Sequence, residues 1–264
     1  MQSVADLYSI GVKEKLRNYW AAWLPSTRFA LGDVGVLNGR IFEKRGSLSD
    51  FGIKFSATPS GNPSSLELVS GSGVAVSLKA KGEVNQAFES VPRGKAGLKI
   101  QFGAEGAFVV QCPAIFEQTI ADLMGVQSAI VATFENGQWD TDWVVIMRLI
   151  SAPAGVILIS SSSSSQLEIS ADINLTAGIA DIGKSEAGLS FKTLKGEIIK
   201  TDSQDLTPFF QLGTLKKRFF GGPKWGTHSM RDDEELSAAS TRPHPKDDPG
   251  LLYFDLIEDE PLSN

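Results

Sequence analysis

Polar and apolar residues alternate strictly along two segments, from residue 74 to residue 84 and from residue 98 to residue 110. A period of two is typical of an amphipathic β-strand. Globular strands usually have about 5–6 residues, whereas a strand that crosses a bilayer needs about 9–11. The pattern therefore predicts a long hairpin. Its apolar face is expected to carry Val74, Val76, Leu78, Leu98, Ile100 and Phe102, and further along Phe108 and Val110.

A second alternating pair lies between residues 167 and 193, and residues 156–159 lead into it. It begins after six consecutive serines, Ser160 to Ser165, a low-complexity run for which we expect flexibility. A loop at residues 176–188 separates its two strands. The apolar positions of this second predicted hairpin are Leu167, Ile169, Ile173, Leu189 and Phe191.

The first part of the chain predicts a helix and a tight hairpin. Residues 3–24 place apolar residues on one face with basic residues between them, and Pro25 is expected to end the helix. A basic helix rich in tryptophan can lie on a membrane surface, but it more often docks on the core of its own domain. Asn38-Gly39 between apolar residues predicts a two-residue hairpin turn.

The middle of the chain predicts a second helix and a central strand. Cys112-Pro113 is expected to open a helix whose apolar stripe contains Phe116, Ile120, Leu123 and Met124. Residues 130–134 have a β-like composition, and the apolar run of residues 143–150 predicts a strand that is covered on both faces.

Strand patterns outnumber helices and do not alternate regularly with them, which favours an α+β fold. We expect a twisted, mainly antiparallel sheet with long amphipathic hairpins, an N-terminal helix and a few short helices. Residues 221–250 are poor in aliphatic side chains and rich in Pro, Gly, Ser and charge, so they predict a flexible linker. The predicted organisation is a body at 1–220, a linker at 221–250 and a short docking segment at 251–264.

The docking segment is predicted from its apolar residues, which would be an exposed sticky strand if they stayed in solvent. Burying three of these side chains would contribute about 1.5–3 kcal/mol each. The residues expected to dock are Leu251, Leu252, Tyr253, Phe254, Leu256 and Ile257.

The formal net charge of −6 is carried by the tail. Residues 1–220 hold 21 Lys or Arg and 21 Asp or Glu, whereas residues 221–264 hold 4 and 10. A neutral body argues against nucleic acid as a partner, because backbone binding needs many phosphate contacts. The start of the chain has no basic segment followed by an apolar core, so no secretory signal is expected. No run of about 18 apolar residues exists, so no membrane-spanning helix is expected. The single cysteine favours a reducing compartment, so we expect a cytoplasmic resting state.

No pattern of catalytic residues emerges from the sequence. Gly178–Ser185 matches a phosphate-binding loop letter for letter, but a strand-like pattern follows it where that loop needs a helix, so no nucleotide is expected. His228 and His244 both lie in the predicted linker. Cys112 has no histidine nearby and is expected to be a buried, inert thiol. Asp140 and Asp142 could bind a hard cation, but two carboxylates in a turn are usually solvated. We therefore expect no enzyme activity, no cofactor and no metal site.

The order of these elements resembles the pore-forming domain of the gasdermins, including their short bacterial members. The resemblance is one of pattern across residues 66–220, with IFEQTIADLM and WVVIMRLI in the places of the helix and core strand between the two hairpins. It implies that the hairpins extend into a membrane after proteolysis removes an inhibitory C-terminal part, which residues 221–264 resemble. Bacterial members typically carry a lipidated cysteine near the start, where this chain has Met1-Gln2-Ser3-Val4, so no lipidation is expected.

Two functions from different classes follow. The first, implied by the resemblance, is an autoinhibited membrane-permeabilising protein with a role in cell death or defence. Its partners would be a lipid membrane, an activating protease and further copies of itself. A pore wall built from strands needs apolar residues toward lipid alternating with polar residues toward the lumen. The second is a non-enzymatic binding or assembly protein, because antiparallel sheets in water also bury one face and expose the other.

Overall fold

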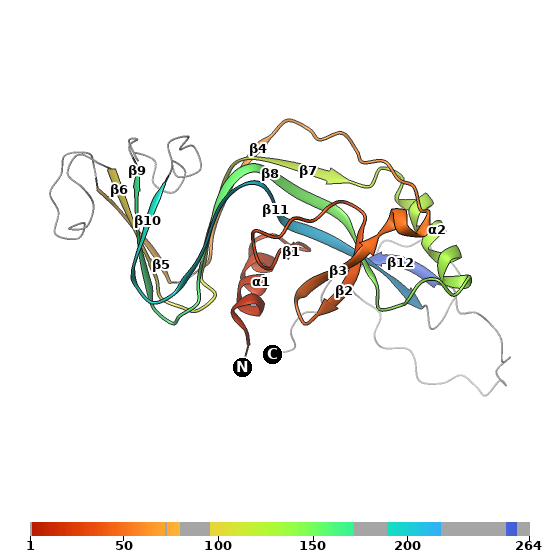
Figure 1. The fold of residues 1–264 in the computed structure, drawn as a ribbon, viewed down its shortest axis with the longest axis horizontal. Coiled ribbons are helices and arrows are strands. Elements are labelled where there is room, and N and C mark those ends of the chain that lie inside the picture. Colours follow the sequence, from red (N-terminus) through yellow and green to blue (C-terminus); the bar gives the residue numbers. More distant parts are fainter. Residues whose placement is uncertain (1, 72, 80–95, 172–188, 218–251, 258–264) are drawn as a thin grey trace, which may run out of the picture.

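The computed structural model describes residues 2–71, 73–79, 96–171, 189–217 and 252–257 (Figure 1). Their strands form an eight-stranded sheet, here the main sheet, and a four-stranded sheet, here the small sheet, and every strand pair is antiparallel. The predicted α+β class with a mainly antiparallel sheet is confirmed. The elements in chain order are α1 (Val4–Lys15), β1 (Trp20–Ala21), β2 (Asp33–Asn38), β3 (Ile41–Ser47), the 3-10 helix η1 (Leu48–Phe51), β4 (Ser64–Val69), β5 (Val74–Lys79), β6 (Ala96–Phe102), β7 (Phe108–Thr119), α2 (Leu123–Glu135), β8 (Val144–Ser160), β9 (Ser165–Ala171), β10 (Ser190–Lys195), β11 (Ile198–Lys217) and β12 (Leu252–Leu256).

Strand β8 runs through the centre of the main sheet, between β11 on one side and β2 and β7 on the other. Its first half is buried on both faces, as the apolar run predicted. Val145 and Met147 pack into the cluster that contains α2 and η1, whereas Val144 and Ile146 pack with Phe29 and other aromatic residues on the opposite face.

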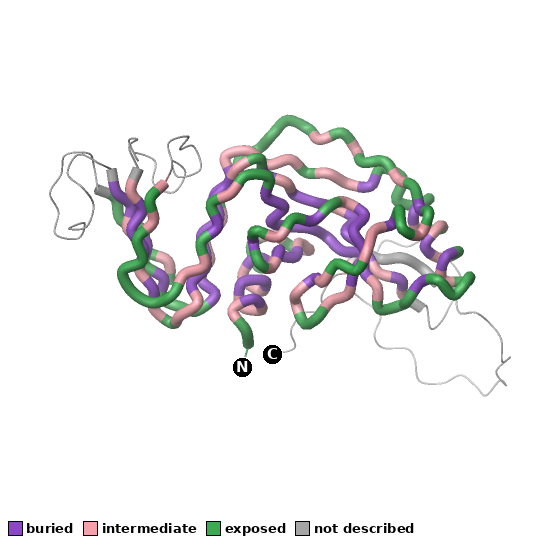
Figure 2. Tube along the Cα trace, in the orientation of Figure 1, coloured by how far each residue is buried: buried purple, intermediate pink, exposed green. Residues whose placement is uncertain are grey.

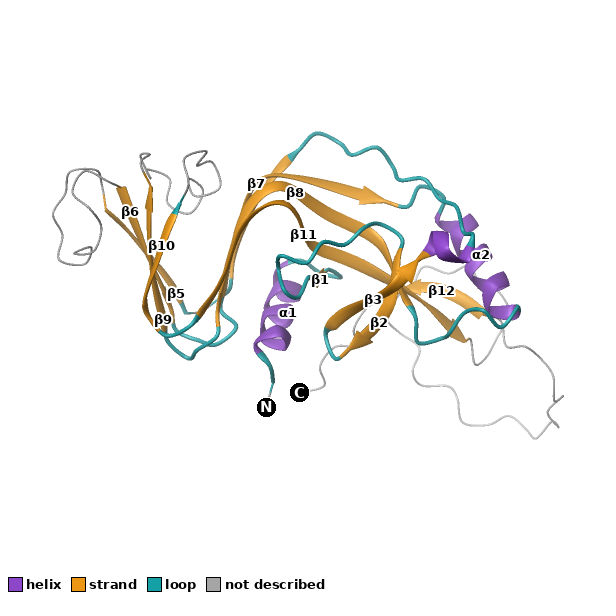
Figure 3. Cartoon of the chain, viewed as in Figure 1, coloured by secondary structure: helices purple, strands orange, loops and turns teal. Residues whose placement is uncertain are grey.

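The strands β7, β8 and β11 bend together (Figure 3). At the bend the β7–β8 ladder has no partners between Gln111↔Val156 and Phe116↔Ser151, and β11 shifts register between Leu206 and Phe209. Each strand carries a proline in this region: Pro113, Pro153 and Pro208. Because proline has no N–H to donate to a ladder, it is tolerated where pairing is interrupted.

Helix α1 lies under this bend (Figure 1) and begins with a capping box in which Ser3 and Asp6 bond each other's backbone N–H. The helix ends at Lys15, so the prediction of a helix up to residue 24 was wrong. Asn18 has a φ of 66° and turns the chain, and Trp20 then enters β1, which pairs with β11. The buried face of α1 includes Tyr8 and Val12 and docks on the main sheet (Figure 2).

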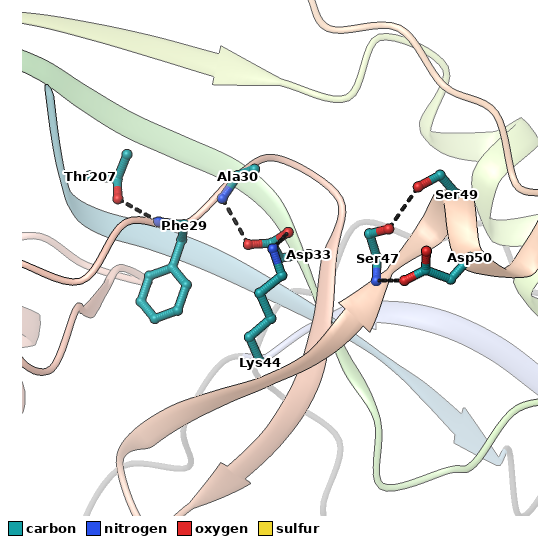
Figure 4. A network of polar contacts seen from close by, with 8 residues as sticks. All are labelled: Phe29, Ala30, Asp33, Lys44, Ser47, Ser49, Asp50 and Thr207. Carbon is teal, nitrogen blue, oxygen red and sulfur yellow. Dashed lines mark hydrogen bonds and ion pairs between the residues drawn. The ribbon is translucent and has the colours of Figure 1, made fainter.

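The hairpin β2–β3 is present, with its turn one residue further along than predicted. Asn38 pairs with Ile41, so the loop is Gly39-Arg40, and Gly39 takes the positive φ of 61°. Figure 4 shows how this region is held. The buried Asp33 carboxylate accepts from the backbone N–H of Ala30 at 2.9 Å and lies 2.7 Å from Lys44 Nζ.

The helix predicted at Cys112–Met124 was also wrong. Residues 112–119 belong to β7, which pairs with β4 and β8, and the helix α2 follows at Leu123–Glu135. The Asp122 side chain caps α2 by accepting from Gly125 N at 2.9 Å. Residues 130–134, which have a β-like composition, are helical. Ile130 is fully buried in the cluster that also contains Val145 and Met147 of β8.

Candidate functional site

The small sheet brings together the strands that the alternation singled out. In β5 and β6, Val74 pairs with Phe102, Val76 with Ile100 and Leu78 with Leu98. Paired residues of antiparallel strands point to the same face. The predicted apolar face of the first hairpin therefore exists over these six positions.

The second hairpin, β9–β10, pairs with the first through β9 and β6. The strand order is β10-β9-β6-β5, and the registers align the predicted apolar positions in rows across the sheet, with Thr193 as a polar member at the β10 edge. One row is Leu78, Leu98, Ile169 and Phe191, and the next is Val76, Ile100, Leu167 and Thr193.

This apolar face packs on the main sheet. Leu98, Ile100, Phe102, Leu167 and Ile169 are at most 2% exposed. Their partners in the same cluster are Val109 of β7 and Val156 and Leu158 of β8, with Leu189 and Phe191 partly buried at the periphery. At the β5 edge, Val76 and Leu78 stay 39% and 40% exposed.

The part of the main sheet that receives the small sheet is formed by β4 and residues 108–111, 156–160 and 198–204, and is called the arm below. Its side chains alternate between two cores. Val156 and Leu158 face the small sheet, whereas Ile157 and Ile159 face α1. Phe108 and Val110 also face α1, so the prediction that they share a face with Leu98 was wrong. The arm is the middle layer of three, between the small sheet and α1.

The arm and the small sheet have the same strand order. The arm is ordered β11-β8-β7-β4, and each of these strands is joined by a short turn to its counterpart in β10-β9-β6-β5. The pair β6–β9 of the small sheet and the pair β7–β8 of the arm also have the same register. From Phe102↔Ser165 to Phe108↔Ile159, both strands advance by six residues. The two layers are therefore one four-stranded ribbon folded back on itself at four turns.

The turns that fold this ribbon are rich in serine and glycine. Ser160 and Ser165 are fully buried, and their hydroxyl groups lie 2.8 Å apart. Ser160 Oγ also donates to Ser162 O at 2.7 Å, and Ser165 Oγ donates to Glu197 O at 3.1 Å. The serine run, for which we expected flexibility, forms hydrogen bonds that link the β8–β9 turn to the β10–β11 turn.

The tail strand β12 pairs with the last part of β11. Leu252 pairs with Lys217 and Leu256 with Gly213, and Ile257 N donates to Leu212 O at 2.8 Å. The Ile257 side chain packs against the aromatic cluster of the main sheet. This contact extends a sheet edge by main-chain pairing.

The candidate residues for chemistry are scattered. Cys112 is buried in the core beside α1, and burial raises the pKa of its thiol to about 12. Asp140 and Asp142 lie in an exposed turn, where Asp142 N donates to Asp140 Oδ1 at 3.0 Å. Within the described ranges, no group of three or more His, Cys, Asp or Glu is placed to hold a metal ion.

Some predicted residues lie outside the part of the chain that the structure describes: Ile173, Gly178–Ser185, His228, His244, Leu251 and the linker 221–250. Sequence reasoning missed the four turns and the pairing of β12. Glycines with positive φ, such as Gly73 and Gly196, were the available signal for the turns.

Among the described residues, neither helix is long and apolar enough to cross a membrane. No protein-family model matches the sequence, and no curated protein matches it. A comparison with solved structures finds similarity to a chain described as the cryo-EM structure of the Gasdermin A3 membrane pore. The identity is 10% and the TM-score 0.35, over 89% of this chain and 97% of that chain. At this TM-score the similarity does not assign the chain to a family.

Proposed function

We propose that this chain is an autoinhibited, membrane-permeabilising protein that forms a pore after proteolytic removal of its C-terminal tail, in a cell-death or defence role. The observation that carries the proposal is the folded ribbon, in which the arm and the small sheet share one strand order and one central register. Opening the ribbon at its four turns would double its length without changing any strand neighbour.

The opened ribbon is long enough to cross a bilayer. The small sheet alone contributes strands of six or seven residues, and continuation into the arm exceeds the about 9–11 residues that a crossing strand needs. Opening also removes the apolar face of the small sheet from the arm, and lipid is the solvent that this face would then prefer. The proposed lipid-facing residues are Val74, Val76, Leu78, Leu98, Ile100, Phe102, Leu167, Ile169, Ile173, Leu189 and Phe191.

Further copies of the chain would complete the wall. In the described part of the chain, β5 and β10 have one strand neighbour each and form the two edges of the small sheet. Strand directions alternate from β10 to β5, so β5 of one copy can pair antiparallel with β10 of the next. Such a head-to-tail contact closes into a ring when the rotation between copies is suitable.

The tail would act by holding β11. It covers the edge of β11 at Gly213–Lys217, next to the edge that β1 covers at Phe209 and Phe210. Strand β11 continues directly into the ribbon, so a partner on its edge stabilises the resting arrangement. We place the activating cut in residues 221–250, after which a tail of this size can dissociate. The resting protein would be cytoplasmic, non-enzymatic and without a cofactor, and the active form would be an oligomer in the membrane.

The test uses the full-length protein with a specific protease site inserted in residues 221–250. Vesicles of phosphatidylcholine and phosphatidylglycerol loaded with a self-quenched dye report leakage. The cut protein should release dye, whereas the uncut protein and a cut-resistant version with a scrambled site should not. Adding an excess of a peptide of residues 251–264 should suppress release again, because β12 would re-pair with β11.

Intact vesicles after complete cutting and verified loss of the tail would contradict the proposal. The exposed Val76 and Leu78 at the β5 edge of the small sheet would then favour a non-enzymatic binding or assembly protein. In that case the small sheet is a docking surface to which a protein partner adds a strand.

A further inference from the structure

The polar face of the small sheet carries an excess of positive charge in a regular arrangement. The registers align two polar rows across the sheet. One row is Ser77, Lys99, Glu168 and Lys192, and the other is Ala75, Gln101, Gln166 and Lys195, where Lys195 follows a β-bulge. Three lysines against one glutamate give these rows a net charge of +2 in each copy.

The charges are not balanced by other acidic groups in the same rows. Glu168 lies between Lys99 and Lys192 in the register and is 3% exposed, so one negative charge is set against two lysines in this row. Lys192 and Lys195 are exposed on the edge strand β10. Lys195 Nζ donates to Ser164 Oγ at 3.1 Å, a contact with a neutral hydroxyl that leaves its charge in place.

We propose that the pore formed by this protein prefers anions, an inference that rests on the proposed function. In a wall whose apolar face meets lipid, the polar face of the small sheet lines the lumen. Every copy contributes the same two rows at the same height, so the oligomer repeats them as two stacked positive rings. Rings of Lys or Arg favour the passage of anions, as rings of Asp or Glu favour cations.

The preference depends on ionic strength. Charge on a wall acts over about one Debye length, which is about 8 Å at 0.15 M salt and about 30 Å at 0.01 M. In a wide lumen the rings therefore discriminate weakly at physiological salt and more strongly in dilute salt. Small anions and acidic solutes are the class of cargo that these rings would admit first.

The experiment measures the reversal potential of planar bilayers of phosphatidylcholine and phosphatidylglycerol under a potassium chloride gradient at low salt. Full-length protein with a protease site in residues 221–250 is cut beside the bilayer. We expect the sign of a chloride preference. Lys99→Glu with Lys192→Glu changes the rows from +2 to −2 per copy, and the reversal potential should change sign.

A milder variant avoids placing new carboxylates beside Glu168. Lys192→Gln with Lys195→Gln neutralises two exposed edge residues, and the reversal potential should move toward zero. Lys54→Glu is the matched control, because Lys54 is exposed and lies outside the small sheet. It should leave the reversal potential unchanged.

The outcomes separate the two proposals. A current that prefers potassium, or that keeps its reversal potential in both lysine variants, overturns the anion preference and leaves the pore standing. A bilayer that stays closed after complete cutting overturns the pore itself, and the anion preference with it.

Discussion

Gly11 of α1 lies so close to Phe108 of β7 that a methyl group at position 11 would come within 2.8 Å of Phe108 Cε1. Phe108 is fully buried and meets the ring of Tyr8 edge-on, with centroids 5.2 Å apart. The ring therefore has little room to retreat. Close docking of α1 on the arm depends on the missing side chain at position 11.

Gly11→Ala should destabilise the protein, although the same change in an exposed helix stabilises it by about 1 kcal/mol. Overpacking a filled core costs about 1–3 kcal/mol, and we expect a net loss of about 1 kcal/mol in urea unfolding. Phe108→Leu should relieve the clash, so the double variant should lose less than the sum of the single losses. A more stable Gly11→Ala protein would contradict the close docking.

Ser160→Ala should destabilise the folded ribbon. It removes the hydroxyl that lies 2.8 Å from Ser165 Oγ in a fully buried site, and a buried polar group that loses a partner costs about 1–3 kcal/mol. Ser163→Ala, at an exposed position in the same serine run, is the control and should be nearly neutral. Thermal unfolding of the two variants provides the comparison. Equal melting temperatures would show that the turn contributes no stability.

The residues proposed to face lipid should be sensitive to a charged substitution in the membrane assay and less so in water. Val76→Lys changes an edge residue that is 39% exposed, so the resting protein should keep its melting temperature. A lysine at the bilayer midplane costs about 2–4 kcal/mol, so dye release after cutting should fall sharply. Ser77→Lys, on the polar face of the same strand, should still release dye. Equal release by the two variants would count against insertion of β5.

Ile257→Pro should weaken the hold of the tail. Proline removes the N–H that donates to Leu212 O at 2.8 Å, and it replaces a side chain that packs on the aromatic cluster. The lost hydrogen bond is worth about 0.5–1.5 kcal/mol. We expect slow dye release without any cut, and faster digestion of the tail by a nonspecific protease. Ile257→Val keeps both contacts and should behave like the unchanged protein.

Stability should fall at alkaline pH. Burial raises the pKa of Cys112 to about 12 and holds the pKa of Tyr8 far above its ordinary value. The unfolded chain loses these protons near pH 9–10, before the folded protein does, so unfolding becomes more favourable as pH rises through that range. Below pH 8 both groups are mostly protonated in the folded and the unfolded state, so they do not make the free energy of unfolding depend on pH.

Tyr8→Phe tests this explanation. Among the residues that the structure describes, the buried Tyr8 hydroxyl has no hydrogen-bond partner, so its removal should raise the melting temperature slightly. Tyr8→Phe should also reduce the fall in melting temperature between pH 8 and pH 11, as measured by thermal unfolding. A decline as steep as in the unchanged protein would assign the effect to other groups. The same burial predicts that Cys112 resists thiol reagents until the protein is unfolded.

Sequence patterns predicted the apolar faces of the two hairpins well and the bounds of the helices poorly. The alternation at Val74–Leu78 and Leu98–Phe102 was a reliable signal because the small sheet packs one face on the arm, so apolar side chains are needed at every second position. The helix expected after Pro113 was wrong because the apolar residues at positions 116, 120 and 123 fit a helical stripe, although Phe116 pairs with Ser151 of β8 and only Leu123 is helical. Short apolar runs carry no period that separates these cases.

The polar turns and the tail were beyond pattern reasoning for another reason. Six serines have no hydrophobic pattern, and their order comes from Glu197, which lies 32 residues after Ser165. The pairing of β12 with β11 is likewise formed by main-chain atoms that every sequence possesses. The strand order that unites the arm and the small sheet is a tertiary property, because it depends on which edges meet.

The prolines at the bend weaken the pairing of the long strands on one side only. The β7–β8 ladder lacks partners around Pro113 and Pro153, whereas the β8–β11 ladder continues past the bend through Ala154↔Gln204 and Ala152↔Leu206. The bend is therefore the place where β7 is least tied to β8, while β8 and β11 stay paired through it.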